Sequence, residues 1–360
     1  MIVLCFLGSW KLCYSSEMEK VLIAGAGGYL GIPLVKKLLE LDFHVIGVDR
    51  YYFGQDLIPS EILNRPNFRL KQKDIRSLDL EDFKGVDAVI DLAGLSNDPS
   101  CDLRPDLTYN INLRGGENVA TMAKKAGVPK YVFSSSCSVY GSGGRKVLSE
   151  ESELLPVSSY AKAKIDIETH LGGLADDSFK VTCLRCATLF GMAPRMRFDL
   201  IINIMAFRAW RDRKIFILGG GKQWRPLVHV EDVATAFTKA VENQDFPENP
   251  LILNVGASEN NFQVFQVANM AKEILTDIEI VKVPDDPDKR SYNVSFEKIK
   301  KQFDFVPEKS PKQGFQEIIS ALSYGALDPE DRRWQTTKYY EFLMDVEQTF
   351  RNVSIDGKIF

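Results

Sequence analysis

The sequence predicts an α/β fold built on a doubly wound parallel sheet. Short apolar runs of strand length recur along residues 20–190, helical apolar patterns separate them, and the first run ends in a cluster of glycines. Strands that alternate with helices at this pace are typical of right-handed βαβ units. The chain has 360 residues, 45% of them apolar, which is enough for one large domain or two smaller ones.

The first unit joins a strand to a helix through glycines. Val21–Ala24 is expected to be a buried strand, Gly25-x-x-Gly28-x-x-Gly31 a tight turn, and Ile32–Glu40 a helix. Free N–H groups at a helix N-terminus and missing Cβ atoms let a pyrophosphate approach closely. The spacing differs from G-x-G-x-x-G, and taken alone the loop is equally compatible with simple close packing of strand on helix.

The next strand, His44–Asp49, ends in an acid about twenty residues beyond the glycines. A carboxylate there hydrogen-bonds the adenine-side ribose hydroxyls of NAD, although a solvated strand-end Asp is the alternative. Asp49 would repel a 2′-phosphate. The sequence therefore favours NAD, while Arg50 leaves NADP as the less favoured cofactor.

The remaining elements of the sheet follow in the same order. A third strand starts at Phe68 and ends before Asp74, a fourth runs from Val86 into the small residues Ala93 and Gly94, and a fifth spans Val128–Phe133. Small residues at a strand's carboxyl end allow a ligand to lie across it. Helices are expected over 105–126 and from Tyr160, and a further strand over 180–185.

Three residues carry the chemistry for moving a proton at an alcohol. Ser136 follows the fifth strand, and Tyr160 and Lys164 are four residues apart, so they share a helical face. A lysine ammonium and a positive nicotinamide would favour the tyrosine phenolate, and Ser136 would hydrogen-bond the same substrate oxygen. An isolated Tyr-x-x-x-Lys is usually an exposed Tyr on a Lys stem, but the glycine loop and Asp49 upstream favour catalysis.

Composition excludes several classes of function. The net charge of −4 gives no electrostatic case for nucleic acid or an anionic membrane, and no apolar run approaches the length of a membrane span. Cys183 and Cys186 lie in an expected buried strand and lack a second ligand pair, so we expect structural thiols, no metal site and a cytoplasmic compartment.

Beyond Gly191 the alternation loosens. An apolar helix is expected to end near Trp210, short strands at 215–221 and 224–232, a helix from Asp232, a buried strand at 251–255 and short segments at 278–283 and 288–294. Residues 1–17 are interpreted as an N-terminal extension or a misassigned start. The tail at 331–360 is charged and aromatic, with helical spacing near 339–350.

Several motifs, taken together, resemble one family. They are Gly25-x-x-Gly28-x-x-Gly31, Asp49, Asp74-Ile75, Leu92-Ala93-Gly94, Asn112, the run from Ser134 to Gly141, Tyr160-x-x-x-Lys164, Leu184-Arg185 and the run from Arg225 to Asp232. Over roughly residues 20–320 the chain is similar to extended short-chain dehydrogenases/reductases of the nucleotide-sugar epimerase/dehydratase family. The resemblance implies a Rossmann-like NAD-binding domain at 18–190, with returning segments at about 215–256, and a smaller α/β domain, mostly 191–330, that binds a nucleotide-diphosphate sugar.

The resemblance also implies roles for individual residues. Those expected to bind the cofactor are Gly25, Gly28, Tyr29, Leu30, Gly31, Asp49, Arg50, Asp74, Ile75, Leu92, Ala93, Gly94, Ser96, Asn112, Ser134, Tyr160 and Lys164. Those expected to bind the substrate are Ser96, Ser136, Thr188, Arg195, Arg197, Asn203, Arg225, Arg290 and Tyr292. Arginines suit a diphosphate because their planar fork matches phosphate, although each could be an ordinary surface charge. Thr188 replaces the family's Asn, and the bulk of Tyr292 favours an unsubstituted hexose over an N-acetyl sugar.

The residues after Ser136 indicate which reaction the family resemblance favours. Cys137 and Ser138 stand where 4,6-dehydratases carry an Asp-Glu pair, and Cys137 is one residue away from the catalytic Cys of other members. The remaining Ser-Tyr-Lys set resembles UDP-galactose 4-epimerase-like enzymes. A C4 dehydrogenase or 4-keto reductase with exchanging NAD(P), and a non-catalytic dinucleotide-binding regulator, remain alternatives. The resemblance also implies a homodimer through the helices near 105–126 and 158–175.

Overall fold

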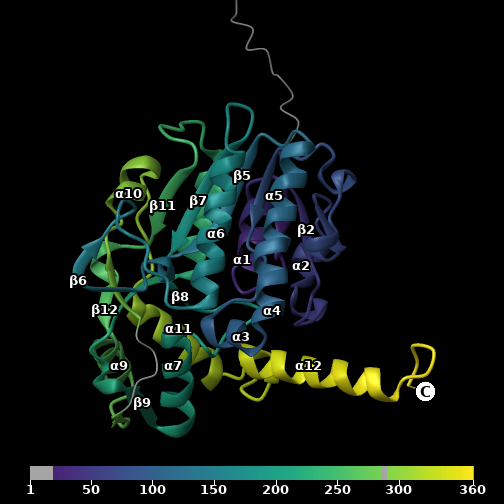
Figure 1. Cartoon of the computed structure of the whole chain (residues 1–360). Helices are drawn as coiled ribbons and strands as arrows, with labels where there is room; N and C mark the ends of the chain where they lie inside the picture. Colours follow the sequence, from purple (N-terminus) through teal and green to yellow (C-terminus); the bar gives the residue numbers. More distant parts are fainter. Residues whose placement is uncertain (1–18, 285–289, 360) are drawn as a thin grey trace, which may run out of the picture.

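The computed structural model of this chain describes residues 19–284 and 290–359 (Figure 1). Its centre is a parallel sheet of seven strands in the order β11-β7-β5-β4-β1-β2-β3. The expected α/β fold is confirmed. The strands are β1 (Lys20–Ala24), β2 (His44–Asp49), β3 (Phe68–Gln72), β4 (Ala88–Asp91), β5 (Lys130–Ser136), β7 (Lys180–Cys186) and β11 (Leu251–Val255).

Helices cover both faces of this sheet. On one face α1 (Gly31–Glu40) packs on α8 (Val230–Glu242), and on the other α5 (Gly116–Lys125) packs on α6 (Ser159–Leu174). Alternate residues of β1 serve the two cores: Val21 and Ile23 belong to the first, Leu22 and Ala24 to the second. This division follows from the two-residue period of a strand and explains why β1 is apolar throughout.

The smaller part is built mostly from the chain after β7. Three short sheets are formed by β12-β10-β8, β13-β9 and β14-β6. Their strands are β6 (Ser142–Leu148), β8 (Thr188–Phe190), β9 (Lys214–Leu218), β10 (Trp224–His229), β12 (Asn261–Gln263), β13 (Glu279–Val283) and β14 (Ser291–Val294). The accompanying helices are α7 (Ile201–Asp212), α9 (Val264–Ile274), α10 (Glu297–Phe303) and α11 (Pro311–Ser323), while the short α2 (Ser60–Leu63) precedes β3. β11 belongs to the large sheet, whereas β9 and β10 lie in small sheets, and the division into domains stays a prediction.

Two expectations need correction. The helix expected over 105–126 is divided into α4 (Pro105–Thr108), a π-helical stretch η4 (Tyr109–Gly115) and α5, and α3 (Asp98–Leu103) precedes it. Apolar spacing does not reveal a π turn, because the turn adds a residue without changing composition. In addition, α8 begins before Asp232, since His229 Nδ1 accepts the Glu231 N–H and thereby caps the helix.

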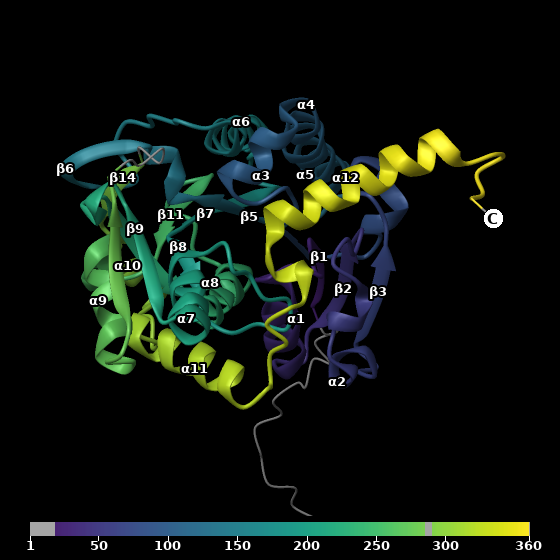
Figure 2. The ribbon, with the colours of Figure 1, turned by 90° about the horizontal axis from the view of Figure 1, so that it is seen from below.

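The C-terminal tail forms α12 (Thr336–Val353), which runs across one end of the large sheet and continues past the body (Figure 2). The short 3-10 turn before it, η8 (Arg332–Trp334), is anchored to the loop after β2, because the Arg333 guanidinium donates to the Phe53 carbonyl and pairs with Asp56. The extension at 1–17 and residues 288–289 lie outside the described residues. Within the described part of the chain, none of the helices has the length and apolar character needed to cross a membrane.

Candidate active site

The glycine turn is shaped by contacts that leave no room for side chains. A Cβ on Gly31 would lie 2.3 Å from the Gly25 carbonyl oxygen, and a Cβ on Gly25, whose φ is +87°, would lie 2.9 Å from Ala93 N. The turn therefore brings the start of α1 close to the end of β4. Within the described residues, the Tyr29 and Leu30 backbone N–H groups have no acceptor. They are available to an anion at a helix N-terminus.

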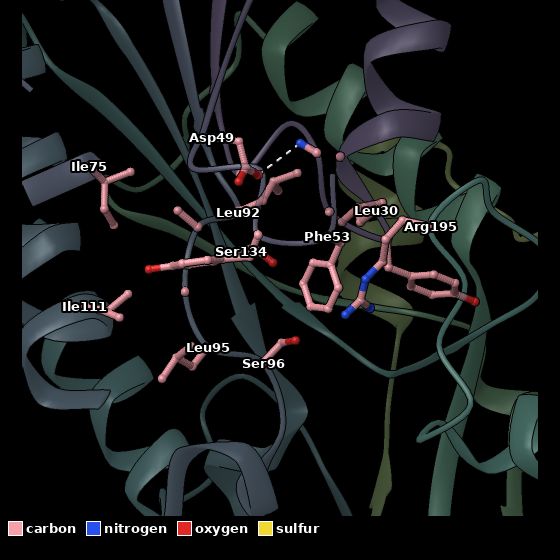
Figure 3. A pocket seen from close by; sticks show the side chains of 18 of the residues that line it. Leu30, Asp49, Phe53, Ile75, Leu92, Leu95, Ser96, Ile111, Ser134 and Arg195 are labelled. Atoms are coloured by element: carbon pink, nitrogen blue, oxygen red, sulfur yellow. Dashed lines mark hydrogen bonds between the residues drawn. The ribbon is translucent and has the colours of Figure 1, made fainter. Parts of the chain in front are cut away.

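Asp49 lies at the edge of this turn. Its carboxylate accepts the Gly27 N–H at 3.0 Å and the Tyr51 N–H at 2.7 Å (Figure 3). Burial raises the pKa of Asp49, while these N–H donors and the charge of Arg195 oppose that shift. The carboxylate therefore holds the loop in shape and faces the space where a ribose is expected.

A single pocket joins most of the residues expected from the sequence (Figure 3). It runs from Asp49 and Ile75, where the adenine end of the cofactor is expected, past the glycine turn, to Ser136 and Tyr160. The expected residues that line it are Gly25, Gly28, Tyr29, Leu30, Gly31, Asp49, Arg50, Asp74, Ile75, Leu92, Ala93, Gly94, Ser96, Ser134, Ser136, Tyr160, Lys164, Arg195 and Arg197. The glycine cradle and the unpaired N–H groups fit the pyrophosphate of a dinucleotide.

The far end of the pocket holds the proposed proton carriers. Lys164 Nζ donates to the Ser134 carbonyl at 2.6 Å and lies 4.7 Å from the centroid of the Phe133 ring and 5.6 Å from that of Tyr160. Lys164 is buried, and burial lowers its pKa while Asp91 opposes this. The ammonium is thus fixed between the end of β5 and the tyrosine.

Tyr160 is not yet activated by its surroundings. Burial raises the pKa of its phenol, the charges of Cys101 and Asp98 add to this rise, and Arg197 lowers it. A positive nicotinamide beside the ring would add to the effect of Arg197. A bound nicotinamide would therefore shift the Tyr160 phenol toward its deprotonated form.

Two residues that were expected to bind ligands, Asn112 and Asn203, do not line the pocket but hydrogen-bond to the loops that form its wall. Asn112 Oδ1 accepts the Leu95 N–H at 2.7 Å, and its Nδ2 donates to the Leu95 carbonyl, which fixes the loop after β4. Asn203 accepts the Gly191 N–H and donates to Tyr29 Oη at 3.1 Å. Both amides are buried, and both hold loops that carry pocket residues. The carboxylate of Asp74 lines the pocket but is paired with Arg50 and Arg76.

Three of the residues expected to bind the sugar nucleotide, Arg225, Arg290 and Tyr292, form a separate group. Arg290 pairs with Asp98 at the start of α3, Arg225 donates to the Arg290 carbonyl, and the Arg225 guanidinium lies 5.6 Å from the centroid of the Tyr292 ring. Neither these residues nor Thr188 line the dinucleotide pocket. α3, which begins at Asp98, packs on α6, and the Ser159 hydroxyl next to Tyr160 donates to Asp102, so this cluster lies toward the Tyr160 end of the pocket.

Arg195 and Arg197 differ in their partners. Arg197 pairs with Asp199, which also accepts the Thr336 hydroxyl at 2.8 Å. Burial favours the neutral form of Asp199, yet Arg197 holds the Asp199 pKa at about 2. Arg195 lies 3.7 Å from the centroid of the Phe53 ring and donates to Thr336 Oγ1 at 3.0 Å.

Sequence analysis missed the aromatic wall of the pocket. Tyr51, Tyr52 and Phe53 follow Asp49 after one intervening residue, Arg50, and Tyr340 comes from α12. Tyr340 contacts both Tyr52 and Phe53, with ring centroids 6.2 and 5.5 Å apart. The run of three consecutive aromatic residues could have been recognised in the sequence, whereas no pattern near Tyr340 predicts that it reaches the pocket.

The cysteines are packed as small apolar groups. Cys101, Cys137, Cys183 and Cys186 are buried and free of disulfides, and burial raises the pKa of Cys137. The Cys137 thiol donates to the Arg185 carbonyl at 3.2 Å and does not line the pocket. Within the described residues, no group of three or more His, Cys, Asp or Glu residues could hold a metal ion.

The chain is similar to several known proteins. UDP-glucose 4-epimerase 1 of Oryza sativa subsp. japonica is 30% identical over 191 residues, which cover 50% of this chain and 54% of that one, so the chain spans about half the length of this relative. UDP-glucuronic acid decarboxylase 1 of Arabidopsis thaliana is 25% identical over 329 residues, covering 87% of this chain and 72% of that one. The structure of MoeE5 in complex with UDP-glucuronic acid and NAD is 26% identical with a TM-score of 0.75, and covers 85% of this chain and 99% of that one.

The family model matches two thirds of the chain. It covers residues 21–256, from β1 to the residue after β11, and so includes the glycine turn, Asp49, Ser136, Tyr160 and Lys164. The chain therefore belongs to the NAD-dependent epimerase/dehydratase family of enzymes.

Proposed function

We propose that this enzyme is a nucleotide-diphosphate-sugar 4-epimerase that acts through a transient 4-keto sugar. The observation that carries the proposal is the meeting of Ser136, Tyr160 and Lys164 at one end of the dinucleotide pocket. The Arg225–Arg290–Asp98 cluster on the same side is suited to a second, diphosphate-bearing ligand.

The reaction needs one proton carrier that works in both directions. Tyr160 takes the proton from the sugar C4 hydroxyl and later returns it, while Ser136 hydrogen-bonds the same oxygen. Lys164 stays protonated and stabilises the phenolate. Bound NAD supplies the acceptor that takes hydride from C4 and gives it back. Return of hydride to the opposite face of the ketone inverts C4.

The residues after Ser136 support epimerisation over dehydration. Cys137 and Ser138 are both buried, and the Cys137 thiol is held on a backbone carbonyl. Elimination of water across C5 and C6 requires a general acid and a general base at the sugar. A raised thiol pKa and a buried hydroxyl do not supply that pair.

Arg225, Arg290 and Tyr292 are proposed to bind the sugar nucleotide. The two arginines would bind the diphosphate, with Arg290 exchanging its partner Asp98 for phosphate oxygens. Tyr292 is 4% exposed and would limit bulk at the sugar C2 substituent. This supports an unsubstituted hexose as substrate. Thr188 would contribute a hydroxyl from β8.

The purified enzyme is expected to interconvert the C4 epimers of a nucleotide sugar without added nicotinamide. The measurement is chromatography and mass spectrometry of products from a panel that includes UDP-glucose and UDP-glucuronic acid, with boiled enzyme as control. A product of unchanged mass and altered retention supports epimerisation. Stoichiometric NADH release, or dependence on NADPH, would instead indicate a C4 dehydrogenase or 4-keto reductase. Loss of water or of carbon dioxide would indicate a dehydratase or decarboxylase, and full biological activity of Tyr160→Phe would indicate a regulator.

We also propose a homodimer. Helices α5 and α6 pack side by side and cover one face of the sheet, where a second copy could add two more helices. Light scattering is expected to give twice the mass of one chain at micromolar concentration, and the mass of a single chain would contradict the proposal. A cytoplasmic location, supported by the free buried thiols, stays a proposal as well.

A further inference from the structure

Arg195 is a buried cation without a matching anion. Its side chain is 2% exposed, and Nε has no hydrogen-bond partner. Within residues 19–284 and 290–359 it forms no ion pair, since the neighbouring Asp199 is paired with Arg197. Burial and the Arg197 charge lower the pKa of Arg195 to about 10. A buried charge in this state is costly, and a bound anion would remove most of that cost.

The space beside Arg195 already contains donors for an anion. Arg195, Tyr29 and Leu30 line the same pocket, and the Tyr29 and Leu30 N–H groups are the unpaired donors at the start of α1. The charge of Arg195 acts on Asp49, which lies at the edge of the glycine turn. Figure 3 shows the Arg195 guanidinium and the Phe53 ring against each other on the pocket wall. Arg195 therefore faces the part of the pocket expected to hold the cofactor's pyrophosphate.

The nucleotide sugar has other candidate arginines. Arg225 and Arg290 lie with Asp98 on the catalytic side and do not line this pocket. Arg195 instead contacts the Phe53 ring and the Thr336 hydroxyl, and neither residue belongs to that cluster. The two diphosphates are thus expected to have separate arginines.

We propose that Arg195 binds the pyrophosphate of the dinucleotide and, together with α12, retains it as a resident group. This differs from the substrate-binding role expected from the sequence. Arg195 Nη2 donates to Thr336 at the start of α12, and Tyr340 on the next turn lines the pocket over Phe53. The Arg333 contacts with Phe53 and Asp56 anchor the segment that leads into α12. The proposal rests on dinucleotide binding and not on which reaction the sugar undergoes.

The variant Arg195→Met tests this in the full-length enzyme. We expect NAD to dissociate about tenfold to a hundredfold faster than from the unaltered enzyme, the range for loss of a charge-assisted hydrogen bond. On cofactor-free enzyme the Kd for ADP-ribose should rise by the same factor, while the Kd for adenosine, which lacks phosphate, should not change. The matched control is Arg332→Met, because Arg332 also lies against an aromatic ring, 3.8 Å from the Phe342 ring centroid, but does not line the pocket.

Melting temperatures separate binding from a purely structural role. Without cofactor, Arg195→Met is expected to melt no lower than the unaltered enzyme, because an uncompensated buried cation is removed. Addition of NAD should raise the melting temperature of Arg195→Met by less than it raises that of the unaltered enzyme. If Arg195→Met does not fold, Arg195→Lys serves in its place, since it keeps the charge and loses the fork. The proposal would be overturned if the rate of NAD dissociation did not change, or if the Kd values for ADP-ribose and adenosine rose equally. It would also be overturned if only the binding of UDP-glucose became weaker.

Discussion

Tyr160→Phe is expected to reduce turnover by about a hundredfold to ten-thousandfold, the usual contribution of a positioned proton carrier. The fold should survive, because within the described residues the Tyr160 hydroxyl has no hydrogen-bond partner to lose. The effect should appear in kcat, with NAD content unchanged, because the hydroxyl acts only when the sugar proton moves. Steady-state kinetics measure kcat, and extraction of bound NAD measures the NAD content.

The control for this substitution is Tyr109→Phe, which removes an exposed hydroxyl and should leave kcat unchanged. A companion variant, Lys164→Met, removes the positive charge that favours the phenolate, so activity should require a higher pH. The alkaline shift distinguishes an electrostatic role of Lys164 from simple packing. Turnover by Tyr160→Phe within a few-fold of the unaltered enzyme would contradict the assignment of Tyr160 as the base.

Local sequence patterns were sufficient for the sheet and for the two ends of the pocket. The glycine turn and Asp49 belong to neighbouring strands, so their meeting follows directly from β1 pairing with β2. Tyr160 and Lys164 are one helical turn apart, and the helix alone brings them together. Contacts of this kind depend on few intervening residues and can therefore be predicted.

Other parts of the site depend on contacts across most of the chain. Asn112 and Asn203 were expected to bind ligands, yet they hold the loops at Leu95 and at Tyr29 and Gly191. Tyr340 reaches Phe53 from α12, nearly three hundred residues later in the chain. A side chain's type gives its chemistry, whereas its direction and partners are set by the packing of distant segments. Residue spacing does not encode that packing.

The second large expected effect is a loss of stability when the buried ion pair between Arg185 and Glu168 is broken. Arg185 on β7 pairs with Glu168 on α6 at 2.7 Å, with both side chains almost fully buried. Arg185→Met alone should lower the free energy of unfolding by about 3–5 kcal/mol, because it leaves the Glu168 charge buried without a partner. Glu168→Leu alone should cost a similar amount. Denaturant unfolding monitored by far-UV circular dichroism, at fixed NAD concentration, measures the change.

The double variant Glu168→Leu with Arg185→Met distinguishes a role of the pair in folding alone from a role in positioning the site. If only charge balance matters, the double variant should recover most of the stability lost in each single variant. The pair, however, also binds the strand that carries the site, because Ser135 Oγ donates to Glu168 and Ser135 is in register with Arg185. Ser134 and Ser136 flank Ser135 on β5, and the Ser134 carbonyl accepts from Lys164. We therefore expect the double variant to be stable yet slower in turnover. Full activity in that variant would show that the pair contributes to folding alone.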